Sequence, residues 1–244
     1  MPYQLPRFRP SVTSTVLVIL AIVGCTALGR WQMSRAELRE HLAHQYESGG
    51  AAGPLSIPTE PIGSENLQWR RFSARGVFVP SQTVFLDNRV HQGVAGFNVY
   101  TPLKLQGSDL HILVNRGWIG LRGGRRTDPN ISTPAGEVFL IGRAVIPTTG
   151  YAGAPQGPSS GRILQSISIV QLASLTGLRL QNFVLQQESD IPDGLVRKWA
   201  IPGTGAEKNK GYALQWFTFA LLALVLFIGF GFSRGRKFEA EKSS

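Results

Sequence analysis

The pattern of apolar and charged positions divides this chain into two long uncharged runs with a polar stretch between them. No charged residue occurs over the 20 positions from Pro10 to Gly29 or over the 23 positions from Gly211 to Ser233. At a rise of about 1.5 Å per residue, each run can cross a hydrocarbon core of about 30 Å as a helix. The pattern therefore predicts two membrane-spanning helices that bracket one external domain.

This pattern gives six predicted segments. They are a cytoplasmic tail (1–11), a first transmembrane helix (12–29), a juxtamembrane helix with a Pro/Gly-rich linker (30–65), a β-rich domain (66–210), a second transmembrane helix (211–233) and a second cytoplasmic tail (234–244). We expect the juxtamembrane helix to end near Gly49 and Gly50, because glycine favours helix C-termini.

Short segments of alternating or β-branched apolar residues between the runs predict strands. They are Arg71 to Val79, Thr83 to Asn88, Ala95 to Tyr100, His111 to Asn115, Glu137 to Val145 and Asn182 to Gln187. One short helix is predicted from Ser168 to Leu175, with the Ser168 hydroxyl as its cap. The fold class is membrane-anchored α+β, in which two transmembrane helices flank an external, mainly antiparallel β barrel or sandwich.

The first apolar run is open to more than one interpretation. Arg7 and Arg9 before Val16 to Val23 are typical of a cleaved signal peptide, and Ile22 to Cys25 loosely resembles a lipoprotein box with Cys25 lipidated. An uncleaved anchor is favoured, because the apolar run continues past Cys25 to Leu28. No disulfide can form within the chain, since Cys25 is its only cysteine.

Charge bears on orientation and on partners. The net charge is +10 at pH 7, and the two tails carry six Lys/Arg against seven close to the ends of the central stretch. Long domains are translocated largely regardless of their charge, so the charge of the short tails determines the orientation of the chain in the membrane. We therefore place both tails on the cytoplasmic (or matrix) side of the membrane and residues 30–210 on the outer side. Basic residues beside the bilayer favour anionic lipid, and an external domain disfavours nucleic acid as a partner.

The usual signatures of catalysis and metal binding do not occur. The sequence has no phosphate-binding Gly-Lys-Ser/Thr loop, no Gly-x-Ser-x-Gly elbow and no HExxH or paired cysteines. His41 and His44 share a helix face, but their polar neighbours favour a solvated surface over a metal site. We predict a protein that is not an enzyme and holds no metal, although a site formed only in the fold stays open.

Two strand ends have a less generic composition, Asn88-Arg89 and Asn115-Arg116-Gly117-Trp118. One interpretation is that they are plain strand ends with arginine at the rim. The other is that Arg89 and Arg116 lie on adjacent strand ends and form a forked basic surface that binds carboxylates. Asn and Gly at these places suit left-handed turns.

Several short strings occur in a characteristic order along the chain. They are LGRWQMSR (28–35), which includes Trp31, then FLDNR (85–89), GFNVYTPL (96–103), LVNRGW (113–118) and GYALQWF (211–217), which includes Tyr212, Gln215 and Trp216. On these strings the chain resembles the Surfeit locus family of cytochrome c oxidase assembly factors, from about residue 28 to 225.

The resemblance implies a function and a set of partners. It implies an integral membrane factor that assists the maturation of haem-copper oxidase subunit one or the insertion of haem a, alongside other oxidase assembly factors. Its expected location is the bacterial inner membrane with residues 30–210 in the periplasm, and the inner mitochondrial membrane is the alternative. The family's haem ligand is a histidine three residues before the tyrosine, where this chain has Asn209 before Tyr212. An amide is a poor axial ligand for iron, so cofactor-binding residues stay unassigned. The alternative function is a membrane-anchored envelope scaffold unrelated to haem.

Overall fold

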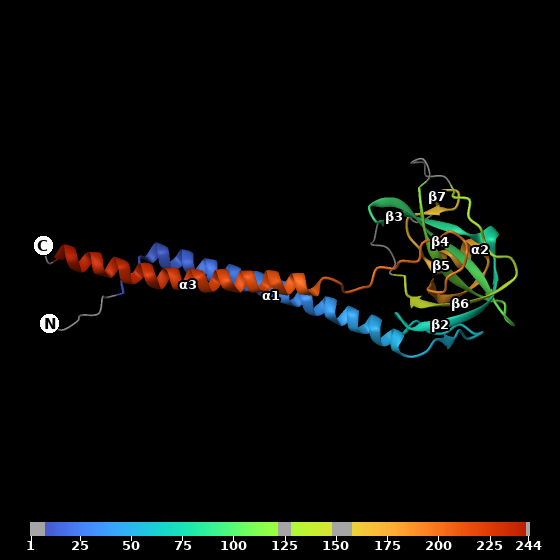
Figure 1. Ribbon diagram of the computed structural model, residues 1–244, viewed down its shortest axis with the longest axis horizontal. Coiled ribbons are helices and arrows are strands. Elements are labelled where there is room, and N and C mark those ends of the chain that lie inside the picture. Colours follow the sequence, from blue (N-terminus) through green and yellow to red (C-terminus); the bar gives the residue numbers. More distant parts are fainter. Residues whose placement is uncertain (1–7, 122–127, 148–157, 243–244) are drawn as a thin grey trace. The chain divides into compact units, whose positions relative to one another are not determined.

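The computed structural model describes residues 8–121, 128–147 and 158–242. The first seven residues of the predicted N-terminal tail therefore lie outside the described residues. The chain divides into two compact units, Met1–His44 with Ile201–Ser244, and Gln45–Ala200. The first unit holds the long helices and the second holds the strands, so the two are described separately (Figure 1).

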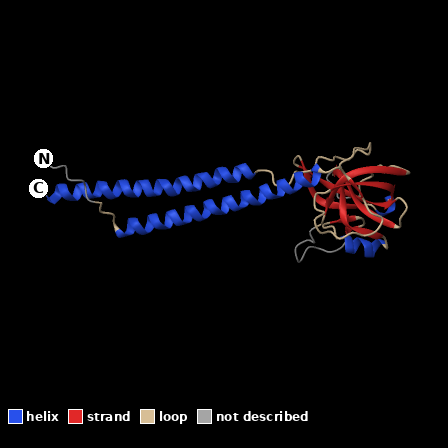
Figure 2. Ribbon diagram, turned by 90° about the horizontal axis from the view of Figure 1, so that it is seen from below, coloured by secondary structure: helices blue, strands red, loops and turns tan. Residues whose placement is uncertain are grey.

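The helical unit is built from α1 (Val12–Ala51) and α3 (Ala206–Lys242). Among the described residues these two helices are long and apolar enough to cross a membrane. They run alongside each other, blue and red in Figure 1 and again parallel to the long axis in Figure 2. The predicted pair of apolar helices that flank a β domain in the sequence is thus confirmed.

The less exposed positions of both helices include a line with a regular three-and-four spacing. In α1 this line runs through 15, 18, 22, 25, 29, 32, 36, 39 and 43; in α3 it runs through 206, 209, 213, 216, 220, 223, 227 and 231. A repeat of seven residues in a helix pair is the signature of coiled-coil packing. We call this buried line on each helix the seam.

Small residues recur every seven positions in the seam, at Gly29, Ala36 and Ala43 in α1 and at Ala206, Ala213 and Ala220 in α3. Ala36 and Ala213 are almost fully buried. A methyl group added at Gly29 would lie 2.6 Å from the Phe217 ring. Small residues let helix backbones approach closely in a membrane, where van der Waals packing rather than the hydrophobic effect holds helices together.

The second unit is a mixed, mainly antiparallel sheet. Its strands are β1 (Leu55–Ser56), β2 (Arg71–Phe78), β3 (Val84–His91), β4 (Val94–Leu105), β5 (Leu110–Gly120), β6 (Glu137–Val145), β7 (Pro158–Ser160), β8 (Ile163–Leu164) and β9 (Arg179–Gln187). The order within the described residues is β1-β2-β6-β9-β5-β4-β3-β8-β7. The predicted strands are confirmed, and the very short β1, β7 and β8 are additions.

One extra pairing turns the middle of this sheet into a barrel. The end of β4 pairs with β2, at Leu103 with Phe78, while the start of β4 pairs with β3. The strands β2, β6, β9, β5 and β4 therefore close a ring. The main core lies inside that ring and draws on all five of these strands, with Phe72, Leu103, Ile112, Leu140 and Phe183 among its members.

A second apolar cluster covers the outer side of the sheet. The helix α2 (Ile169–Thr176) packs there through Leu172 against Leu86, Leu113 and Val184. As predicted, Ser168 caps this helix, because its side chain accepts a hydrogen bond from the Gln171 backbone N–H.

The last turns of α1 belong to the barrel unit and pack against it. The helix ends at Ala51, one residue past the end expected near Gly49 and Gly50, so both glycines are still helical. They serve close packing: a methyl group at Gly49 would lie 2.8 Å from the Trp69 carbonyl. The Arg143 guanidinium stacks 3.9 Å from the Tyr46 ring, donates to the Tyr46 carbonyl at 2.7 Å and pairs with Glu188 at 2.6 Å.

The linker after α1 is also fixed to the barrel. The fully buried Gln181 side chain donates to the carbonyls of Pro58 and Glu60 and accepts from the Ile62 N–H. These three hydrogen bonds give backbone groups of the linker a partner in the barrel wall, so this part of the linker is an ordered strap.

A substitution at the tight helix contact provides a first test. We expect Gly29→Leu to disrupt the pairing of α1 and α3, because even a methyl group there meets the Phe217 ring. Gly24→Leu is the matched control, since position 24 lies in the same apolar run and has open space around it. Proteolysis of the full chain in detergent reports the pairing; equal protection of both variants would contradict this packing.

The buried histidine predicts a pH dependence of stability. Burial lowers the pKa of His111, which sits on β5 beside Lys104 and Asp109. The unfolded chain takes up a proton near about pH 6.5, whereas the folded barrel resists it. Above that pH this histidine therefore costs no stability, and the free energy of unfolding falls as the pH drops below it. We expect His111→Leu to flatten the fall in melting temperature between pH 7 and 5, and the exposed His41→Gln to leave it unchanged.

Candidate functional site

Three of the sequence strings meet at the Trp118 indole. Its Nε1–H donates to the Arg89 carbonyl at 2.8 Å, and its ring lies 5.2 Å from the His91 ring. A methyl group at Gly96 would lie 2.6 Å from the indole, so only glycine fits beneath it. Trp118 on β5 thus fixes the base of the β3–β4 hairpin, although FLDNR, GFNVYTPL and LVNRGW are separate in the sequence.

Asn88 and Arg89 form an irregular, exposed step in β3. The register of β3 against β4 shifts between Leu86 and Arg89, and Asn88 adopts a φ of +58°. Its backbone N–H donates to Asp87 Oδ1 at 2.6 Å. Asn suits this left-handed conformation better than most residues, and the step leaves Asn88 and Arg89 at the surface.

The interpretation of Arg89 and Arg116 as a basic fork is wrong, and so is a rim position for Arg116, because Arg116 is 0% exposed. Its guanidinium donates to Thr133 Oγ1, to the Ser132 carbonyl and to Asp193 Oδ2, and it lies 4.9 Å from the centre of the Phe78 ring. The fork hypothesis assumed that arginine stays at a rim, but a charged group can be buried when it is paired and hydrogen-bonded.

Arg116 belongs to a buried ionic cluster with Asp193 and Arg197. The Asp193 carboxylate accepts from Arg116 at 2.9 Å and from Arg197 at 2.6 Å. Burial lowers the pKa of the Arg116 guanidinium, and Asp193 acts against that shift. The arrangement fixes the segment after β9 to β5, so this cluster stabilises the barrel and offers no carboxylate-binding surface.

The other residues of the LVNRGW string also face inward. Gly117 has a φ of +145°, and a methyl group there would lie 2.8 Å from Leu195 Cβ, which explains the glycine. Trp118 and Val196 exchange backbone hydrogen bonds at 2.8 and 2.9 Å. Asn115 Nδ2 donates to the buried Tyr100 hydroxyl at 3.2 Å, and burial raises the pKa of that phenol.

Three of the four candidate residues of the helical unit, in contrast, face outward. Trp31 is 56% exposed and Tyr212 is 54% exposed, and Gln215 is exposed as well. Trp216 is half-buried in the seam and packs edge-on against Phe219. Among the described residues the Gln215 side chain has no hydrogen-bond partner, whereas Thr218 donates to the Leu214 carbonyl of its own helix. We call Trp31, Tyr212 and Gln215 the outward face.

Asn209 lies in the seam and is engaged with the other helix. Its Nδ2 donates to Gln32 Oε1 at 3.0 Å. Next to it, Lys210 pairs with Glu40 and with Glu207. Haem iron prefers imidazole, thiolate or thioether as an axial ligand. The residues at this position therefore do not fit an axial ligand set for haem a.

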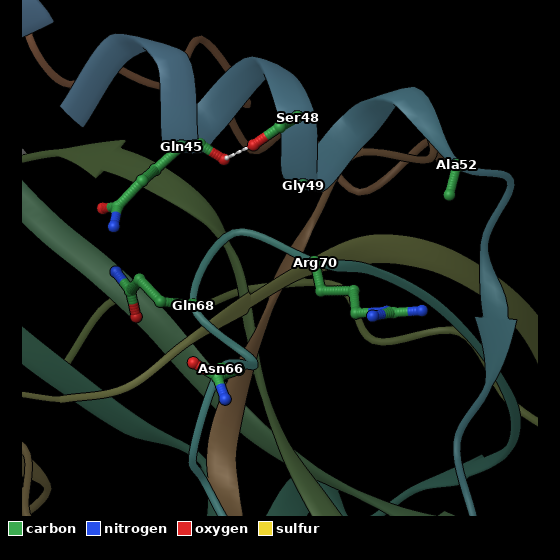
Figure 3. A pocket seen from close by; sticks show the side chains of 7 residues that line it. All are labelled: Gln45, Ser48, Gly49, Ala52, Asn66, Gln68 and Arg70. Carbon is green, nitrogen blue, oxygen red and sulfur yellow. Dashed lines mark hydrogen bonds between the residues drawn. The ribbon is translucent and has the colours of Figure 1, made fainter. Parts of the chain in front are cut away.

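No group of three metal-ligating His, Cys, Asp or Glu side chains occurs in residues 8–121, 128–147 and 158–242. The barrel unit does carry a polar hollow of about 450 Å³ between the end of α1 and the turn before β2. Figure 3 shows the amides of Gln45, Gln68 and Asn66 on one side of this hollow and Arg70 on the other. Gln68 Oε1 already accepts a hydrogen bond from the Ile146 N–H. The hollow therefore offers scattered polar groups and no catalytic set.

Comparison with known proteins places these features in context. A family model described as SURF1 family matches residues 19–221. A SURF1-like protein of Mycobacterium tuberculosis is 28% identical over 250 residues, covering 100% of this chain and 92% of the relative. One from Rickettsia bellii is 27% identical over 225 residues, or 87% and 88% of the two chains. Surfeit locus protein 1 of Homo sapiens is 25% identical over 193 residues, or 72% and 64%.

The two arginines of the strings give opposite predictions. We expect Arg116→Met to lower the free energy of unfolding by about 3–5 kcal/mol, because it breaks a buried ion pair. Arg89→Met, at the surface, should change it by no more than about 0.5 kcal/mol. Denaturant unfolding of the full chain in detergent, followed by tryptophan fluorescence, measures both. Similar losses in the two variants would contradict the burial assigned to Arg116.

Proposed function

The chain belongs to the SURF1 family, and we propose that it is an integral membrane assembly factor for haem-copper cytochrome c oxidase that assists the maturation of subunit one. Members of this family are linked to cytochrome oxidase assembly and are not known enzymes. The observation that carries the proposal is the match over residues 19–221, which includes about half of each apolar run and the whole barrel.

In this proposal the helical unit and the barrel unit have different roles. The helices would dock beside the membrane-embedded subunit through the outward face, because a Gln215 amide without a partner favours a hydrogen bond from another helix. The barrel would act outside the membrane, in the periplasm of a bacterial inner membrane, with both tails in the cytoplasm. Other oxidase assembly factors and the lipid bilayer are the further partners in this proposal.

In this proposal haem a is bound by subunit one and not by this chain. Since the amides of Asn209 and Gln32 do not fit an axial ligand set, we assign no haem step to this chain's side chains. The exposed Asn88 and Arg89 step, supported from below by Trp118, is the part of the barrel that we propose for contact with the maturing subunit.

Removing the gene tests the function. We expect deletion to lower both the oxidase activity and the haem a content of the membranes, and the wild-type gene to restore them. Oxidase that is unchanged in the deletion strain would refute the proposal. Crosslinking that captures another envelope protein and no oxidase subunit would favour the scaffold alternative.

The docking face can be tested apart from the deletion. We expect Gln215→Leu to reduce crosslinking of the chain to subunit one, because the interhelical hydrogen bond is lost. Thr218→Val is the matched control, since the Thr218 hydroxyl is already satisfied within α3. Equal crosslinking of both variants would exclude Gln215 as a docking residue.

A further inference from the structure

A seam with a strict repeat does not fix its own register. Small residues recur every seven positions on both helices, from Gly29 to Ala43 and from Ala206 to Ala220. Sliding one helix by seven residues would again place small residues opposite small residues. Packing alone therefore distinguishes poorly between the observed register and its neighbours.

Gln32 and Asn209 interrupt this repeat with one polar pair. Gln32 lies between Gly29 and Ala36 in the seam of α1, and Asn209 lies between Ala206 and Ala213 in the seam of α3. The two amides meet at 3.0 Å. A seven-residue slide would bring Asn209 opposite a different residue and leave both half-buried amides without each other.

We propose that the Gln32–Asn209 amide pair fixes the register of α1 against α3, and that this structural role replaces an axial haem ligand at position 209. A single polar residue in an otherwise apolar seam is a known means of specifying coiled-coil register. The cost of leaving a polar group unpaired beside the membrane favours the register in which the pair forms.

Neighbouring polar groups hold the same end of the hairpin but cannot replace the pair. Arg39 donates to the Thr204 carbonyl at 3.0 Å, and Lys210 bridges to Glu40. Long arginine and lysine side chains tolerate displacement, and exposed ion pairs contribute little. His41 and His44 point away from the seam into solvent, so they do not supply the imidazole that position 209 lacks.

Disulfide trapping in membranes tests the register. Gln32 meets Asn209 and the helices are antiparallel, so the position ten residues before Gln32, Ile22, lies across the seam from the Ala220 turn of α3. In the full chain with Cys25→Ser and Ile22→Cys, Ala220→Cys should crosslink to the cysteine at position 22, whereas Ala213→Cys and Phe227→Cys, each seven residues away, should not, because a disulfide needs Cα atoms within about 7 Å.

The pair is then removed or exchanged. With Gln32→Leu and Asn209→Leu together, we expect the preference for position 220 over 213 and 227 to fall from at least about tenfold to about threefold or less. The exchanged pair, Gln32→Asn with Asn209→Gln, keeps both amides and should keep the preference. Retention of a single register in the leucine variant, or its loss in the exchanged variant, would overturn the proposal.

A spectroscopic arm tests position 209 itself. The wild-type protein in detergent, mixed with haem a, should leave the Soret band of the haem unshifted. A shift in the wild type that Asn209→Leu abolishes would show iron ligation by Asn209 and overturn the second half of the proposal. This arm is independent of oxidase assembly, so its failure and that of the proposed function remain distinguishable.

Discussion

The close approach of α1 and α3 at glycine and alanine is the constraint from which the rest of the helical unit follows. In a bilayer, lipid tails are as apolar as leucine, so helices gain little from burying large apolar side chains against each other. Contact at Gly29, Ala36 and Ala213 brings the backbones together instead. Because small residues fill the contact between the helices, larger aromatic side chains such as Trp31 and Tyr212 point outward, where other molecules can reach them.

The barrel unit solves a different problem, because it has no disulfide to stabilise it. Its ring of five strands encloses the main core, and polar side chains fasten the segments that leave the ring. Gln181 binds the strap, Asp193 joins the chain after β9 to β5 through Arg116, and Arg143 holds the end of α1. Each of these fastenings joins segments far apart in the sequence, so removing one would loosen a connection without emptying the core.

Much of this fold was predictable from local patterns, and the remainder depends on contacts between distant segments. Alternation identified β2 to β6 and β9, and a single serine identified the cap of α2. Strands of two or three residues carry too little alternation to detect. The burial of Arg116 required knowing that Asp193 lies opposite it, 77 residues away. The seam, in contrast, was present in the sequence as small residues seven apart, and counting at that period would have identified Gln32.

The candidate residues therefore separate into two groups with different physical roles. Asn115, Arg116 and Gly117 face the interior, where a change acts first on folding, so a loss of function at these positions says little about contacts with a partner. Asn88, Arg89, Trp31, Tyr212 and Gln215 are exposed, and nothing in the barrel or the helix pair requires their side chains for packing. Trp118 links the groups, since its indole N–H binds the hairpin that presents Arg89. Of the candidate residues, only the exposed group can change its surroundings when another molecule binds.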